Sequence, residues 1–125
     1  MNKKYLSKII ATDNEGLQVI SACCSGAEVK VDEIKYLQSK KVFLLSLNRS
    51  KVEADEKDKK VTGICKFEFV DRVKSKNIKQ TDPEEKLELI GMDYLKNNDN
   101  YEINLMFTNN AYITLSTEII EVTLD

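Results

Sequence analysis

The strongest constraint on the fold is the alternation of apolar and polar residues in YEINLMFTNNAYITLS, residues 101–116. A period of two places every second side chain on one face of a β-strand. The central asparagines predict a hairpin turn. A three-residue loop, residues 108–110 with Asn110 in the left-handed conformation, keeps one face of the hairpin apolar. The expected cross-strand pairs are then Phe107 with Ala111, Leu105 with Ile113 and Ile103 with Leu115, all turned inward.

Residues 28–49 predict a second pair of antiparallel strands. The apolar positions of the first strand change parity at Asp32–Glu33, which predicts a one-residue bulge there. In the expected register Tyr36 lies opposite Phe43, Ile34 opposite Leu45, Val31 opposite Leu47 and Val29 opposite Arg49. A further strand over residues 61–70 is expected to turn four side chains to one face, namely Val61, Cys65, Phe67 and Phe69.

One helix is predicted after the first strand, within residues 12–27. Thr12 and Glu15 have the spacing of a capping box, in which each side chain bonds a free backbone N–H group of the first turn. Gly26 offers a stop at the other end. The apolar stripe of this helix consists of Leu17, Ile20, Cys24 and Ala27.

Together these patterns predict an α+β fold. We expect a predominantly antiparallel, strongly curved sheet, or a partly open barrel, of about seven strands. A chain of 125 residues has the size of a single domain, residues 1–125. Residues 51–60, KVEADEKDKK, interrupt every apolar pattern with charge and predict a mobile loop.

Several segments resemble a family of small alphaproteobacterial proteins that is catalogued only as a domain of unknown function. The resemblance covers roughly residues 8–125. The segments that carry it are DNEGLQVISA, VKVDEIKYLQSKKVFLLSLNR, the FEFVDRVKSKNI region, LELIGM and YITLSTEIIEVTLD. The resemblance implies a single cytoplasmic domain, and it brings no established activity, cofactor or catalytic residue.

The composition argues against most catalytic chemistry. The chain has no histidine, which excludes Ser-His-Asp and Cys-His catalysis and histidine-bearing zinc sites. Its three cysteines show no C-x-x-C spacing, and its four glycines form no phosphate-binding loop. We therefore expect no enzyme, no cofactor and no metal.

A cytoplasmic location is the expected one. Three cysteines with an adjacent pair are not a secreted disulfide framework. The start, MNKKYLSKIIATD, is too charged for a signal peptide, and no apolar run approaches the length of a membrane span. The sequence therefore predicts no membrane partner.

A basic segment, RVKSKNIK at residues 72–79, is the best candidate binding site. In a strand, alternate cations project from one face at a spacing of about 6.6 Å, close to that of successive phosphates. Residues 66–80 contain five cations and two acids, a net charge of +3. Because the net charge of the whole chain is −2, the rest of the chain carries −5. The simpler interpretation, which we favour, is a solvated strand edge, where lysines are common because they block pairing between edges. The candidate anion-binding residues are Arg72, Lys74, Lys76 and Lys79.

Arg49 is one of only two arginines and follows the apolar strand VFLLSL. Its parity turns it toward the apolar face, where an unpaired guanidinium is costly. We expect a structural role in which it donates to the last helix carbonyls, around residues 22–25, or to Glu53.

Two kinds of function fit these observations. The favoured one is a non-enzymatic protein-binding or scaffolding module, with another protein or a second copy of the chain as the partner. The alternative is a binder of anions or nucleic acid that uses residues 72–79. No aromatic residue lies between these cations to stack on bases, so nucleic acid is the less favoured partner.

Overall fold

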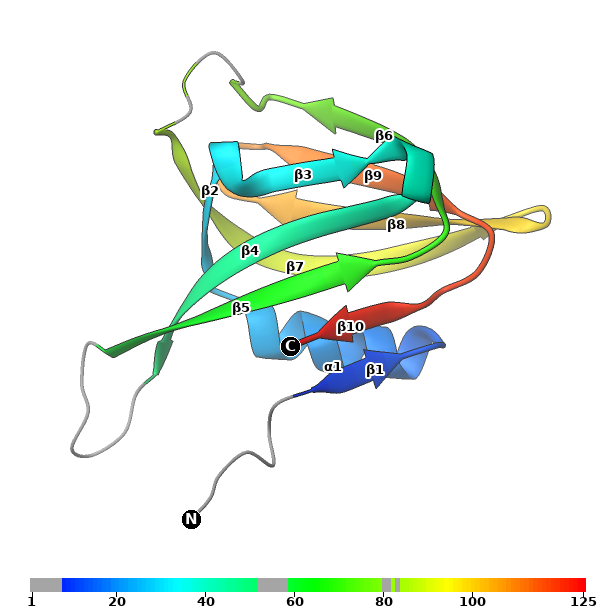
Figure 1. Cartoon of the computed structure of the whole chain (residues 1–125), viewed down its shortest axis with the longest axis horizontal. Coiled ribbons are helices and arrows are strands. Elements are labelled where there is room, and N and C mark those ends of the chain that lie inside the picture. Colours follow the sequence, from blue (N-terminus) through cyan, green and yellow to red (C-terminus); the bar gives the residue numbers. More distant parts are fainter. Residues whose placement is uncertain (1–7, 52–58, 80–81, 83) are drawn as a thin grey trace.

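The computed structural model describes the backbone of residues 8–51, 59–79, 82 and 84–125, and the side chains of all these residues except 49–51 and 59–61. Within this part of the chain, ten strands and one α-helix are formed (Figure 1). In chain order the elements are β1 (Ile9–Ala11), α1 (Asn14–Cys24), β2 (Glu28–Lys30), β3 (Ile34–Leu37), β4 (Val42–Lys51), β5 (Lys59–Phe67), β6 (Val70–Lys76), β7 (Lys86–Asn97), β8 (Asn100–Phe107), β9 (Tyr112–Thr117) and β10 (Val122–Leu124).

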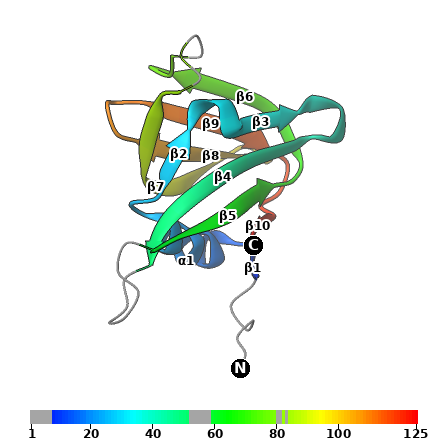
Figure 2. The same cartoon turned by 60° about the vertical axis from the view of Figure 1, so that its left-hand side comes forward.

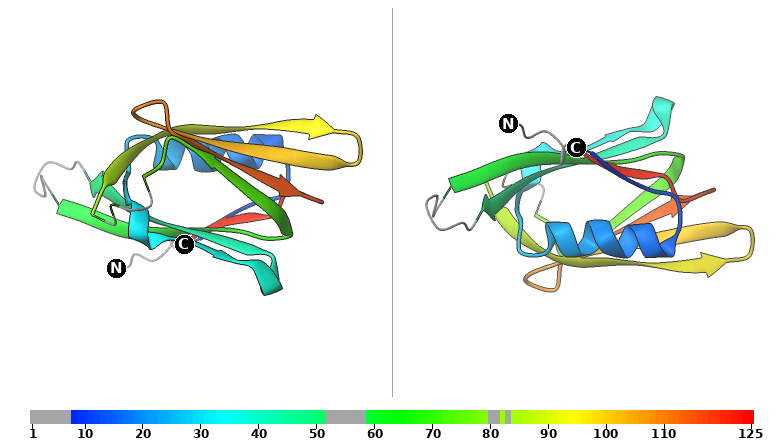
Figure 3. Two further views of the ribbon diagram at one scale, coloured as in Figure 1. Left: turned by 90° about the horizontal axis from the view of Figure 1, so that it is seen from above. Right: turned by 90° about the horizontal axis from the view of Figure 1, so that it is seen from below.

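All ten strands belong to one antiparallel sheet. The pairing order is β1-β10-β5-β4-β2-β7-β8-β9-β6, and β3 pairs with β4 beside this path. The sheet curves so strongly that β7, β8 and β9 face β3, β4 and β5 across the core (Figure 3). Among the described residues the path has two ends, β1 and β6, so the pairs do not close into a ring.

The expected antiparallel sheet with one helix after its first strand is confirmed, but the count of about seven strands was wrong. Two differences account for most of the excess. A 3₁₀ turn, Val31–Glu33, divides one expected strand into β2 and β3. The basic segment forms a strand of its own, β6, after a connection of two residues.

The turn at Val31–Glu33 also changes the predicted register. Tyr36 lies opposite Phe43 and Ile34 opposite Leu45, as expected. Beyond the turn, however, Glu28 lies opposite Asn48, so the predicted pairing of Val29 with Arg49 was wrong. Three inserted residues shift the register further than the one-residue bulge that was expected.

The strand β5 ends at Phe67, three residues before the predicted end at residue 70. Phe67 and Cys65 are buried on the inner face, but Phe69 is 39% exposed and was wrongly placed there. Phe69 has a φ of 60° in the connection to β6, a left-handed conformation that turns its side chain away from the alternating pattern. Val70 takes the buried position instead.

The hairpin of β8 and β9 has the predicted register. Leu105 lies opposite Ile113 and Ile103 opposite Leu115. The N–H of Phe107 donates to the carbonyl of Ala111 over 2.8 Å, which closes the three-residue loop. Asn110 has the expected left-handed conformation, with a φ of 58°. The inward side chains are all buried: Ile103, Leu105, Phe107, Ile113 and Leu115.

The helix begins one residue later than the predicted capping box implies. Asp13, rather than Thr12, is the N-cap, and its carboxylate accepts from the N–H of Gly16 over 2.8 Å. Gly16 also passes close to β1, since a Cβ there would lie 3.0 Å from the Cβ of Ala11. The predicted stripe is buried, and Gly26 ends the helix with a φ of 87°.

Helix α1 packs against β7 and covers one end of the curved sheet, whereas β3 and β6 lie at the opposite end (Figures 1 and 2). The pairing of β7 with β8 shifts between Leu89 and Gly91. Beside this irregularity the N–H of Met92 donates to the buried hydroxyl of Ser21 over 2.9 Å. The helix therefore satisfies a backbone group that the irregular strand exposes.

The predicted loop at 51–60 is shorter than expected, because β4 extends through Lys51 and β5 begins at Lys59. Residues 52–58 lie outside the described part of the chain, so the expected mobility stays a prediction.

Candidate functional site

A groove lies between β3 and β6, at the end of the molecule away from the helix. Its volume is about 340 Å³. We call it the edge groove. Its walls are Val31, Asp32, Ile34 and Tyr36 on one side and Val73, Ser75 and Ile78 on the other, above the buried Phe43 and Ile113.

Both walls of the edge groove are strand edges. In the described part of the sheet β3 pairs with β4 alone, and β6 pairs with β9 alone. The second edge of each strand therefore faces the groove with its backbone N–H and C=O groups. Such edges accept an added strand.

One end of the edge groove is closed. The hydroxyl of Tyr36 on β3 donates to the carbonyl of Val70, the first residue of β6, over 2.8 Å. The N–H of Val70 donates to the carbonyl of Lys41 over 2.8 Å. The Lys41 ammonium also forms an ion pair with the Asp71 carboxylate over 3.0 Å. The hydrogen bond within this pair is the main cause of the raised pKa of Lys41.

The other end of the groove is formed where β6 stops. Asn77 has a φ of 62°, and its side-chain amide donates to the carbonyl of Asn110 over 2.8 Å. This conformation ends the strand and turns Ile78 back toward the core, where it is half-buried. Asp32 lies across from it and is exposed.

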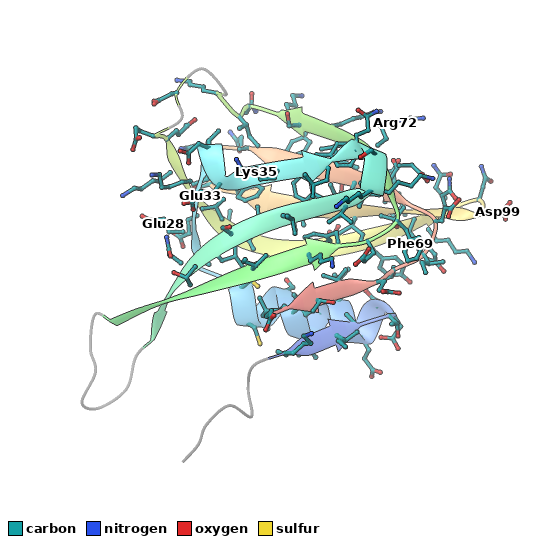
Figure 4. All side chains as sticks on the ribbon, in the orientation of Figure 1. Glu28, Glu33, Lys35, Phe69, Arg72 and Asp99 are labelled. Atoms are coloured by element: carbon teal, nitrogen blue, oxygen red, sulfur yellow. The ribbon has the colours of Figure 1, made fainter. Side chains whose placement is uncertain are left out.

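The outer rims of the groove are basic. Figure 4 shows Lys35 on β3 and Arg72 on β6. Along β6 the side chains alternate, so Lys74 and Lys76 share the face of Arg72, opposite to Val73 and Ser75. All four are exposed. None of the four forms an ion pair with a described carboxylate, although the Lys76 ammonium lies 6.0 Å from the ring centre of Tyr112.

Acidic side chains reduce this positive charge near the closed end. A second hollow, of about 430 Å³, is lined by Arg72 together with Asp71, Asp99 and Glu102. Arg72 and Asp99 both lie toward this end of the molecule in Figure 4. The positive character of β6 is therefore greatest around Lys74 and Lys76.

The predicted basic stripe is only partly assembled. Arg72, Lys74 and Lys76 face Ser116, Thr114 and Tyr112 of β9. Lys79 lies beyond the end of β6, so the alternation that aligns the other three does not extend to it. The backbone of Arg49 pairs with Val61, but its side chain is not among those described, and its structural role stays a prediction.

The sequence analysis missed the residues that wall the groove. Val73 and Ser75 were not predicted, because the segment was interpreted from its cations alone. Their alternation with Arg72, Lys74 and Lys76 was the available signal, since it gives β6 an outer and an inner face. The opposing wall comes from residues about 40 positions earlier, and no local pattern connects the two.

No disulfide joins the three cysteines, all of which are described. A hydrogen bond with Cys24, followed by burial, raises the pKa of Cys65 well above its usual value. Across the described residues no cluster of three or more metal-binding side chains is found.

The fold and the groove define a class: a small α+β domain whose curved antiparallel sheet presents the free edges of β3 and β6 to one groove. The chain belongs to the protein family of unknown function DUF2948, whose model matches residues 7–125. No curated protein and no solved structure matches the chain. No helix in the described segments is long and apolar enough to span a membrane.

Proposed function

We propose that the protein is a non-enzymatic binding module that takes an extended segment of a partner protein into the edge groove as an added β-strand. The observation that carries this proposal is the groove itself, an apolar hollow between two strand edges that each have a partner on one side. Backbone hydrogen bonds would supply affinity, and the groove would receive every second side chain of the bound segment.

The chemistry of the chain supports a binding role over a catalytic one. The sequence contains no histidine, and the groove walls carry one ionisable acid, Asp32, and the phenol of Tyr36. Tyr36 is already engaged in a hydrogen bond to Val70. We propose a cytoplasmic location as well, which three cysteines without a disulfide support.

Peptide selection tests the proposal. A display library of random ten-residue peptides is selected against the protein, and the dissociation constants of enriched peptides are measured for two variants. Ser75→Trp fills the groove and is expected to weaken binding by about tenfold, or about 1.4 kcal/mol. The matched control is Ser46→Trp, since Ser46 lies on β4 outside the groove and opposite Ile64.

Amide hydrogen exchange gives a second, independent readout. A strand added to β6 forms hydrogen bonds with its free edge. Within residues 72–76, the alternate amides that point away from β9 should therefore exchange more slowly in the complex. Equal effects of Ser75→Trp and Ser46→Trp, without added protection of β6, would place binding elsewhere and refute the proposal.

A second candidate function is the binding of nucleic acid or another polyanion by Arg72, Lys74 and Lys76. It is favoured by the shared face of these three cations and by their lack of described carboxylate partners. A salt titration with mixed-sequence single-stranded oligonucleotides tests it. Three phosphate contacts predict that the logarithm of affinity falls with that of salt concentration with a slope of about −2.

A further inference from the structure

We infer that the segment bound in the edge groove alternates apolar and acidic residues. This inference rests on the proposed function and names the chemistry of its partner. An added strand would have an inner face and an outer face. The inner face would lie against the apolar hollow, and the outer face would lie beside the basic rims.

The inner face requires apolar side chains. Ile34 and Tyr36 on β3 and Val73 on β6 are half-buried against the core. The groove opens onto Phe43 and Ile113, which are 1% and 2% exposed. A strand placed between the edges directs every second side chain into this hollow, where an apolar group removes these surfaces from water and a charged group would be desolvated.

The outer face favours carboxylates. The remaining side chains of the added strand lie beside Lys35 on one rim and beside Lys74 and Lys76 on the other. Directly opposed side chains on neighbouring strands have Cβ atoms about 5 Å apart, within reach of an ion pair. Like charges at this separation repel, so a basic strand is disfavoured at the same positions.

Asp32 limits the acidic preference to part of the groove. It lines the wall at the end where β6 stops, and it forms no ion pair with a described cation. An acidic residue of the bound segment that approaches Asp32 would be repelled. The preferred segment therefore carries its acids beside Lys35, Lys74 and Lys76 and a neutral or basic residue beside Asp32.

Three fluorescent eight-residue peptides test the inference by anisotropy at low salt. Each alternates valine with a second residue, which is glutamate, glutamine or lysine. We expect the glutamate peptide to bind about tenfold more tightly than the lysine peptide, with the glutamine peptide between them, and the difference to shrink at high salt. Asp32→Asn should strengthen binding of the glutamate peptide.

Charge reversal locates the effect. Lys74→Glu should reduce the difference in affinity between the glutamate and lysine peptides, because it sets one acid against the remaining cations Lys35 and Lys76. The matched control, Lys96→Glu, makes the same change at an exposed position of β7 that does not line the groove, and it should leave the difference unchanged. A circular dichroism spectrum and a melting curve establish that both variants are folded.

The results distinguish failure of the acidic preference from failure of the proposed function. Equal binding of the three peptides, all sensitive to Ser75→Trp, would overturn the acidic preference and leave the proposed function standing. If none of the three peptides binds, and the random library also yields no sequence whose binding depends on the groove, both the acidic preference and the proposed function are overturned. Tight, salt-dependent binding of a mixed oligonucleotide that is lost in Lys74→Glu, without peptide binding, would favour the nucleic-acid function instead.

Discussion

Cys65 illustrates how a single residue acquires its properties from distant parts of the chain. Its thiol is hydrogen-bonded with that of Cys24 at the end of α1, and both side chains are fully buried. The sequence predicted a small core residue at this position from its alternation with Phe67. It could not predict the contact with Cys24, because the two residues lie 41 positions apart in the sequence and meet only when the helix closes the end of the sheet.

The raised pKa of Cys65 predicts that the protein becomes less stable in mildly alkaline solution. In the unfolded chain the thiol loses its proton near its ordinary pKa of about 8.5, whereas in the folded protein it keeps the proton to a higher pH. The contribution to stability is therefore complete below about pH 8.5 and is lost as the pH rises toward the folded-state pKa.

Urea denaturation at about pH 7.5 and about pH 9.5 measures this loss as a lower free energy of unfolding at the higher pH. Cys65→Ala removes the titrating group and should flatten the dependence, although it also leaves a cavity. Val122→Ala provides the control, since it also truncates a fully buried side chain but removes no titrating group, and it should keep the slope of the native protein. Identical slopes in all three proteins would contradict the assignment to Cys65.

The individual elements show which patterns determine structure locally. The β8–β9 hairpin could be predicted in full because its loop and its alternation lie within 16 consecutive residues. The register of β2 could not be predicted. The alternation of apolar positions shows only whether an odd or an even number of residues is inserted, not how many. An insertion of one residue and one of three change parity alike, and the 3₁₀ turn Val31–Glu33 inserts three.

The start of α1 gives a test at this scale. Asp13→Ala removes the carboxylate that accepts from the N–H of Gly16 and should lower the free energy of unfolding by about 1 kcal/mol. Thr12→Ala changes the residue that the capping-box pattern had indicated and should have a smaller effect. A thermal or urea unfolding series compares them, and a larger loss for Thr12→Ala would contradict the observed cap.

The loop of the β8–β9 hairpin gives a second test at the scale of the elements. Asn110 has a left-handed backbone, in which alanine is disfavoured by about 1 kcal/mol and glycine is not. Asn110→Ala should therefore lower the midpoint of thermal unfolding, and Asn110→Gly should not. The control is Asn97→Ala, because Asn97 is exposed and lies in regular strand conformation at the end of β7. Equal midpoints for Asn110→Ala and Asn110→Gly would show that the loop relaxes.

At the scale of the whole molecule, the sheet has a covered end and an open one. Helix α1 closes the first, and the edge groove opens at the second (Figure 1). The antiparallel class and the helix could be predicted from periodicity. The groove could not, because its walls come from residues near 34, 75 and 113, and only the curvature of the whole sheet brings them together.

The cations of β6 predict that two copies of the molecule do not pair along this strand. Two copies that met along β6 would place Lys74 and Lys76 of each against the same cations of the other, and such charges block edge-to-edge pairing. Lys74→Val with Lys76→Val should therefore increase the apparent mass in light scattering. Lys40→Val with Lys96→Val changes the net charge equally at exposed positions outside β6 and should not. A monomeric β6 variant would contradict this role.

The bond from Tyr36 to Val70 has a consequence for the size of anything that occupies the groove. It joins the two walls at one end, whereas the walls are not joined by any described hydrogen bond at the end near Asp32 and Ile78. A guest strand therefore meets a fixed stop at the end where Tyr36 and Val70 are joined. Residues added to that end of the guest would collide with the joined strands, so the groove would set the position of one terminus of its guest.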